Sequence, residues 1–122
     1  MISTKYKILY VDDEEINVQV FMITFSSRFQ VLTACNGMEG LEILNKNPDI
    51  KFVISDMKMP VMNGLEFIKE IKKIKNKLPC MLLSGYQQTE EIYEAITNGL
   101  IVDYMIKPFS KSKIERLIAS QI

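Results

Sequence analysis

The sequence predicts an α/β fold of the flavodoxin-like, doubly wound type: a five-stranded parallel sheet of order 2-1-3-4-5 with five helices. First, strand-like and helix-like segments alternate along all 122 residues, at about 24 residues per pair. Second, four strand-like runs end in polar side chains that suit one site: Asp12-Asp13, Asp56, Ser84 and Lys107. The acids can meet only if the first and third strands are neighbours, and this order makes them so.

Each strand-like run is short, apolar and bounded by polar or turn-forming residues, as expected of the buried strands of a parallel sheet. In chain order, the predicted strands cover residues 6–11, 29–34, 51–56, 80–84 and 103–106.

The first two helices follow from apolar spacing. Over residues 14–25, Ile16, Val20 and Ile23 recur at i, i+4 and i+7, which is the spacing of a helix. The opening acids of this segment suit the positive end of the helix dipole. Residues 38–46 form the second predicted helix, which stops just before a proline.

The remaining helices are expected over residues 64–75, over residues 88–97, and after Lys107-Pro108. Asn-Gly pairs occur at 36–37, 63–64 and 98–99. Such pairs often form β-hairpin turns, but each of these adjoins helical periodicity. We therefore interpret them as helix boundaries.

Composition indicates a single domain over residues 1–122. A hydrophobic share of 48% is ordinary for one soluble core of this size, without disulfide or metal staples. Fifteen basic and fifteen acidic residues cancel, so no direct nucleic-acid or anionic-membrane partner is expected. No apolar run approaches the roughly 20 residues of a membrane span, and no signal peptide precedes the first strand. The protein is therefore expected to be cytoplasmic. Met1 is expected to be the natural amino terminus.

Cysteine and histidine usage narrow the chemistry further. Cys35 and Cys80 abut apolar runs in no metal or redox spacing, so both are expected to be buried, reduced thiols. Histidine is absent, which excludes imidazole-based triads and histidine-ligated zinc. Any phosphohistidine donor must therefore be another protein.

The strand-end residues predict a magnesium-dependent phosphoryl site. Three carboxylates at one edge repel each other and need a cation to stay ionised. Oxygen ligands without His or Cys favour a hard ion, and room for water and phosphate favours Mg²⁺. Asp56 can then attack phosphorus to give an aspartyl phosphate. Ser84 can hydrogen-bond one phosphoryl oxygen, and Lys107 can pair with another.

In order along the chain, these motifs resemble the receiver domain of two-component response regulators over essentially the whole length. The matching segments are Val11-Asp-Asp-Glu14, Asp56-Met-Lys-Met-Pro-Val-Met-Asn-Gly64, Leu83-Ser-Gly-Tyr86 and Tyr104-Met-Ile-Lys-Pro-Phe109. They resemble the acidic pair, the phosphoacceptor loop, the hydroxyl switch segment, and the aromatic switch with its Lys-Pro signature.

The resemblance implies a role for each site residue. Asp56 would be the phosphoacceptor. Mg²⁺ would be bound by Asp13, by Asp56 and by the Lys58 carbonyl, with Asp12 acting through a bound water.

For the switch, the resemblance implies that Ser84 and Lys107 contact the phosphoryl group and that Tyr104 moves inward when Ser84 moves. The peptide bond before Pro108 would be cis. Lys58, Gly85 and Tyr86 stand at positions that tune dephosphorylation, with Gly85 where alanine is frequent. A long cation and a phenol there leave the lifetime of the phosphorylated state open.

The resemblance also implies the partners. A sensor histidine kinase or a histidine phosphotransfer protein would donate the phosphoryl group. The output face would be formed by the fourth helix, the fifth strand and the last helix, binding a partner, an attached output domain or a second copy.

Three alternatives fit less well. A haloacid-dehalogenase-like phosphatase needs a second acid two residues after its nucleophile, where Lys58 stands, and a cap domain. A dinucleotide-binding domain needs a Gly-x-Gly-x-x-Gly after its first strand, which is missing. A receiver-like module that is never phosphorylated usually lacks one site residue, and here none is lacking. The chain is therefore expected to be a signalling domain and not an enzyme.

Overall fold

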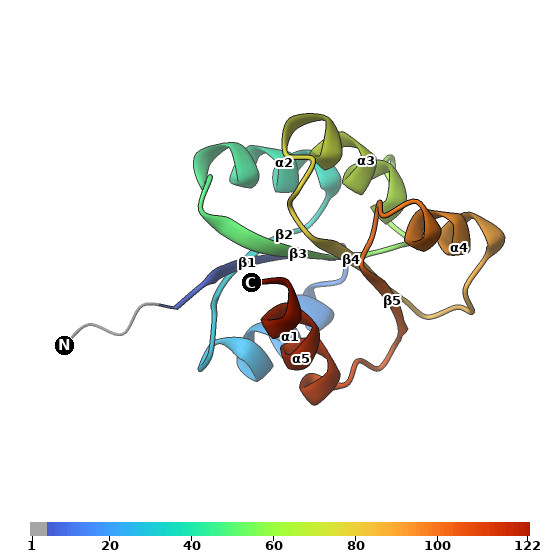
Figure 1. Cartoon of the computed structure of the whole chain (residues 1–122). Helices are drawn as coiled ribbons and strands as arrows, with labels where there is room; N and C mark the ends of the chain where they lie inside the picture. The colour runs from blue at the N-terminus through green and yellow to red at the C-terminus, as the bar shows by residue number, and fades with distance from the viewer. Residues whose placement is uncertain (1–4) are drawn as a thin grey trace.

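A computed structural model describes residues 5–122 and confirms the predicted sheet (Figure 1). Five parallel strands lie in the order β2-β1-β3-β4-β5. The elements are β1 (Lys7–Val11), α1 (Glu15–Phe25), β2 (Gln30–Ala34), α2 (Gly37–Lys46), β3 (Ile50–Asp56), α3 (Gly64–Ile74), β4 (Cys80–Ser84), α4 (Glu90–Thr97), β5 (Asp103–Ile106) and α5 (Lys111–Gln121). Met1 lies outside the described residues.

The helices form two layers around the sheet. Helices α1 and α5 cover one face, and α2, α3 and α4 cover the other (Figure 1). This arrangement is the one that right-handed crossovers produce for this strand order. Each layer seals its own hydrophobic cluster against the sheet.

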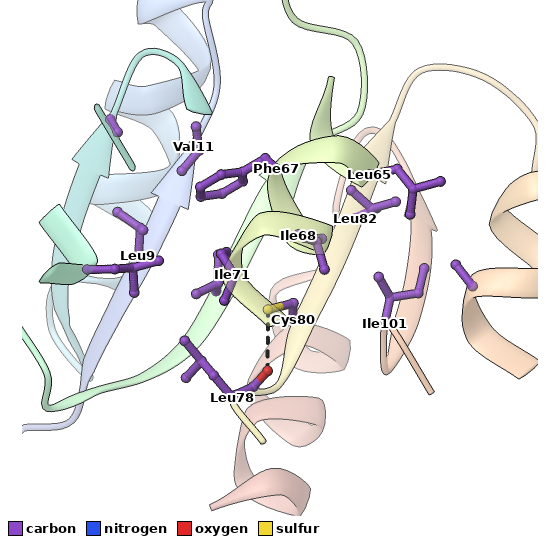
Figure 2. Close-up of a cluster of buried hydrophobic side chains, with 14 of the residues drawn as sticks. Leu9, Val11, Leu65, Phe67, Ile68, Ile71, Leu78, Cys80, Leu82 and Ile101 are labelled. Carbon is purple, nitrogen blue, oxygen red and sulfur yellow. Dashed lines mark hydrogen bonds between the residues drawn. The ribbon is translucent and has the colours of Figure 1, made fainter. Parts of the chain in front are cut away.

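Helix α3 supplies much of the hydrophobic core on the face of the sheet that α2, α3 and α4 cover. Its Phe67, Ile68 and Ile71 point onto the strands and are almost completely buried (Figure 2). Burying a side chain of this size is worth about 1.5–3 kcal/mol. Gly40 of α2 is required for this packing, because a β-carbon there would overlap the ring of Phe67. The tight packing of α3 fixes the loop that precedes it.

Strand register brings the polar strand ends to one edge of the sheet. The pairs nearest that edge are Val11 with Ser55, Asp56 with Leu83, and Ser84 with Ile106. All strands run parallel, so the residues that follow β1, β3, β4 and β5 gather above the same edge.

Helix α1 is confirmed, but the three residues whose spacing predicted it lie on its exposed side. Ile16, Val20 and Ile23 are 65%, 46% and 83% exposed. Phe21 and Phe25 are buried against the sheet instead. Because α1 is apolar on both sides, periodicity identifies the helix without identifying the side that packs.

The Asn-Gly pairs are helix boundaries, as predicted. Asn36 and Asn63 accept hydrogen bonds from the first turns of α2 and α3 through their side chains. Gly99 follows the end of α4 with φ of 76°. Gly64 opens α3 against the Asp56 loop, where a β-carbon would overlap the Asp56 carbonyl. The start of α3 is thereby tied to the proposed phosphoacceptor.

The cysteine prediction was half wrong. Cys80 is buried, and burial raises the pKa of its thiol to about 12. Cys35 is exposed, because β2 ends at Ala34 and the chain turns outward before α2. Among the described residues, no helix is long and apolar enough to cross a membrane.

Candidate functional site

Three carboxylates converge where β1 and β3 end. One oxygen from each of Asp12, Asp13 and Asp56 lies within 4.8 Å of the others. Asp12 and Asp56 are only 0% and 5% exposed, whereas Asp13 is exposed. Like charges this close are unfavourable without a compensating cation.

Asp12 is the most constrained of the three. Its Oδ2 accepts a hydrogen bond of 2.7 Å from the hydroxyl of Tyr10 and lies 3.1 Å from Nζ of Lys107. Its Oδ1 accepts a hydrogen bond of 3.0 Å from the N–H of Glu14. Within residues 5–122, no hydrogen bond or ion pair engages the Asp13 carboxylate, which therefore remains free to bind a ligand.

Lys107 bridges the two buried carboxylates. Its Nζ lies 3.1 Å from Asp12 Oδ2 and 3.1 Å from Asp56 Oδ1. Burial alone lowers the pKa of Lys107, but the hydrogen bond to Asp12 and the charges of both acids outweigh it and raise that pKa.

The pKa of Asp56 is also raised, by burial first and by the Asp12 charge second, despite the opposing effect of Lys107. One lysine therefore does not fully compensate two buried carboxylates. The uncompensated charge, and ligands that are all oxygen, fit a hard divalent cation.

A cavity of about 820 Å³ opens over Asp56. It is lined by Asp13, Glu14, Asn17, Asp56, Lys58, Met59, Pro60, Gly85, Tyr86 and Lys107. The cavity is open to solvent and has room for a phosphoryl group with bound water.

The predicted hydroxyl lies at the end of β4, in an adjoining pocket that shares Lys58 and Tyr86 with the cavity. Ser84 is 3% exposed, and its Oγ accepts a hydrogen bond of 3.2 Å from the N–H of Tyr86. At the rim, Nζ of Lys58 lies 3.4 Å from the Tyr86 hydroxyl and 5.1 Å from the ring centre. Nothing lies within 4 Å of where a Gly85 β-carbon would be, so this residue leaves the approach open.

Tyr104 lies on β5, away from the cavity. Its half-buried ring packs against the cluster under α2, α3 and α4. Its hydroxyl is buried and has no hydrogen-bond partner among the described residues. An unpaired buried hydroxyl costs about 1–3 kcal/mol. The peptide bond between Lys107 and Pro108, which follows β5, is cis, as predicted.

The loop after Asp56 contains an unusual backbone. Val61 has φ of 71°, and its side chain is fully exposed. A β-branched residue rarely adopts this left-handed conformation, so the phosphoacceptor loop is locally strained.

The predicted residues therefore occupy three zones. Asp12, Asp13, Asp56 and Lys107 lie in direct proximity. Lys58, Gly85 and Tyr86 line the cavity, and Ser84 lies beside it in an adjoining pocket. Tyr104 lines neither of the two. Sequence reasoning missed Tyr10, which contacts Asp12. The available signal was strand periodicity, since residues 10 and 12 share one face of a strand.

Comparison with known proteins agrees with this geometry. The family model of the response regulator receiver domain matches residues 8–119. The chain is 33% identical to the two-component response regulator ORR11 of Oryza sativa, in an alignment that covers 92% of this chain and 78% of the relative. It is 31% identical to a chemotaxis protein CheY homolog of Campylobacter jejuni, in an alignment that covers 93% of each chain.

Solved structures of receiver proteins share the fold of this chain. A response regulator receiver domain protein from Clostridium thermocellum superposes with a TM-score of 0.88 at 33% identity, covering 95% of this chain and 93% of the other. The chemotaxis protein CheY4 of Vibrio cholerae gives a TM-score of 0.86 at 27% identity, covering 98% and 100%.

The chain belongs to the response regulator receiver domain family. It is a phosphoacceptor signalling module of two-component systems and not a classical enzyme, and the family implies a histidine kinase as partner. Its three clustered aspartates are typical of the receiver-domain metal site.

Proposed function

We propose that residues 1–122 form one receiver domain in which Asp56 accepts a phosphoryl group from a phosphohistidine. The observation that carries this assignment is the position of Asp56 on the floor of the open cavity, between the free carboxylate of Asp13 and the ammonium of Lys107. Its carboxylate is the nucleophile. Because the donor is a phosphohistidine, the protein is expected to lie in the cytoplasm, where the kinase or phosphotransfer domain that carries this group is found.

Mg²⁺ would suit this chemistry, and Asp13, Asp56 and the backbone carbonyl of Lys58 would hold it. Asp12 would act through a water, because its oxygens already accept hydrogen bonds from Tyr10 and Glu14. When bound, Mg²⁺ neutralises charge on the transferring group and lets the carboxylates face each other without repulsion.

In the transfer, a carboxylate oxygen of Asp56 forms a bond to phosphorus while the phosphorus–nitrogen bond to the donor imidazole breaks. The imidazole leaves with the electron pair of that bond and takes up a proton. Lys107 moves from the Asp56 carboxylate to a phosphoryl oxygen, and Ser84 donates its hydroxyl to another.

Movement of Ser84 provides the signal. Its Oγ now accepts from the Tyr86 N–H, so its displacement alters the loop that leads into α4. The ring of Tyr104 then settles more deeply and its hydroxyl gains a partner. Such coupling requires two states that already coexist, of which the phosphoryl group favours one.

The exposed apolar stripe of α1 supports a docking place for the donor. Ile16, Val20 and Ile23 follow one side of the helix, and Asn17, next to Ile16, lines the Asp56 cavity. Exposed apolar side chains gathered on one side of a helix are common at interaction sites. A donor helix that lies on it reaches Asp56 with its histidine.

The output face comprises α4, β5 and α5. Its charges are complementary: α4 carries acids, and α5 carries mainly bases, since its one acid, Glu115, is paired with Arg28. They are Glu90, Glu91 and Glu94 on α4, and Lys111, Lys113 and Arg116 on α5. Exposed Tyr93 and Ile106 add apolar area. A second copy related by a two-fold axis, or an output partner, can pair with both charges at once.

Lys58, Gly85 and Tyr86 tune the lifetime of the aspartyl phosphate. They stand at the cavity rim, where water must approach the phosphorus, and Lys58 contacts Tyr86 across it.

Beryllium fluoride, a stable phosphoryl mimic, tests the proposal in solution. With Mg²⁺, it is expected to shift amide resonances around Asp56 and also near Tyr104 and α4 in the wild type. Ser84→Ala is the matched control and is expected to keep the first set while losing the second. Binding that persists unchanged in Asp56→Asn contradicts the site. Shifts confined to the loops around Asp56 in the wild type contradict the switch and leave the phosphoacceptor intact.

A further inference from the structure

Tyr10 is a buried hydroxyl that lies inside the acidic site. The residue is 1% exposed, and its hydroxyl donates to Oδ2 of Asp12 at 2.7 Å. Its ring stacks on Phe21 with a centroid distance of 4.1 Å and an interplanar angle of 3°. The stack fixes the ring, so the hydroxyl is aimed at one atom.

Asp12 has three donors for its two oxygens. Tyr10 and Lys107 share Oδ2, and the Glu14 N–H engages Oδ1. Asp12 is 0% exposed, so bulk water does not readily replace a donor that leaves. A buried carboxylate oxygen without a donor is costly.

Of the three donors, only Lys107 is expected to leave Asp12 when Asp56 is phosphorylated. In the proposed function its ammonium turns toward the phosphoryl group. If Lys107 were the sole donor to Oδ2, its departure would leave that buried oxygen without a hydrogen-bond donor. Because the Tyr10 hydroxyl stays in place, Oδ2 keeps a donor and the lysine is released at lower cost.

We propose that Tyr10 is a positioning residue of the phosphoacceptor site, which holds Asp12 so that Lys107 can leave it for the phosphoryl group. This inference rests on the proposed function. A purely structural role would be fulfilled by the ring alone, since a phenylalanine retains the stack on Phe21.

The decisive variant is Tyr10→Phe, which removes only the hydroxyl. In saturating Mg²⁺, its affinity for beryllium fluoride is expected to fall about tenfold, the size of one hydrogen bond to a charged group. Tyr6→Phe removes the hydroxyl of a half-exposed residue just before β1, at the end of the strand away from Asp12, and it is expected to leave the affinity unchanged. Phe21→Leu disturbs the stack without removing the hydroxyl and is expected to lower stability more than affinity.

A double-mutant cycle tests whether Tyr10 acts through Asp12. In an Asp12→Asn background, Tyr10→Phe is expected to change the affinity less than twofold. A full tenfold loss in that background overturns the proposal, because Tyr10 would then act independently of Asp12. Unchanged affinity in Tyr10→Phe, or equal losses in Tyr10→Phe and Phe21→Leu, also overturns it. If the wild type itself binds no beryllium fluoride, the proposed function fails first.

Discussion

The ammonium nitrogen of Lys107 lies 3.1 Å from Oδ1 of Asp56, so a protein cation contacts the proposed phosphoacceptor before any phosphoryl group arrives. The same nitrogen lies 3.1 Å from Oδ2 of Asp12. In the resting state, Lys107 therefore supplies part of the positive charge that bound Mg²⁺ would supply to the same carboxylates.

Replacing Lys107 should lower the stability of the protein and raise its affinity for Mg²⁺. Lys107→Ala leaves Asp12 and Asp56 without their shared cation. Breaking a fully buried pair costs about 3–5 kcal/mol, and the 23% exposure of this side chain reduces the cost to about 1–3 kcal/mol. Mg²⁺ should bind more tightly to the variant because its competitor is gone. Urea unfolding in chelator and in Mg²⁺ measures both effects, and a variant whose stability loss Mg²⁺ does not reduce contradicts this account.

Asp13 and Asp12 should differ as metal ligands. Asp13 is exposed and free, whereas Asp12 is held by Tyr10, Glu14 and Lys107. Asp13→Ala should weaken Mg²⁺ binding by roughly 10–100-fold, which is at least the loss seen when outer-shell partners are removed. Asp12→Ala should weaken it less. Magnesium titrations of the two variants give the order, and equal losses would show that both acids bind the metal directly.

Without metal, Asp56 should destabilise the protein at neutral pH. Burial and the Asp12 charge raise its pKa in the folded state, so the fold favours the protonated acid. This penalty is fully present above the folded pKa and disappears as pH falls toward the unfolded value, about 4. In chelator, Asp56→Asn should therefore be more stable than wild type at pH 7, and the difference should shrink as pH falls toward 4. Urea unfolding across this range would contradict the account if the difference grew on acidification.

Relieving the loop after Asp56 should stabilise the fold. Val61 adopts φ of 71° with a fully exposed side chain, so its replacement loses no packing. Asparagine tolerates this conformation, and Val61→Asn should raise the free energy of unfolding by about 1 kcal/mol. Val61→Ala is the control, because alanine keeps most of the left-handed penalty. Equal stability of the two variants would show that strain is not the cause.

The sequence predicts most of the fold because the local signals agree with it. Apolar runs give the bounds of β4 and β5, and Asn-Gly dipeptides give the helix starts at Asn36 and Asn63. Tertiary contacts do not override these local signals. The sequence does not predict which side of α1 is buried, because both sides are apolar. Only packing against the sheet determines that Phe21 and Phe25 are the buried residues.

The site divides in the same way. Its acids and lysine are predictable, because a parallel sheet brings every strand end to one edge. The contact between Tyr10 and Asp12 is a matter of side-chain geometry, and so is the choice of Asp12 rather than Asp13 as the partner of Lys107. A spacing of two along a strand shows a shared face but no hydrogen bond. The backbone of Val61 carries no sequence signal at all, since valine is a poor choice for that conformation.

Asp56 is proposed to be the residue that accepts the phosphoryl group. Incubation with acetyl phosphate and Mg²⁺, followed by intact-mass and peptide-mass measurement, shows which residue is modified. The wild type should gain the mass of one phosphoryl group on the peptide that contains Asp56. The gain should be absent in chelator and in Asp56→Asn. The same gain on another residue in Asp56→Asn, or a gain that needs no divalent cation, would contradict the account.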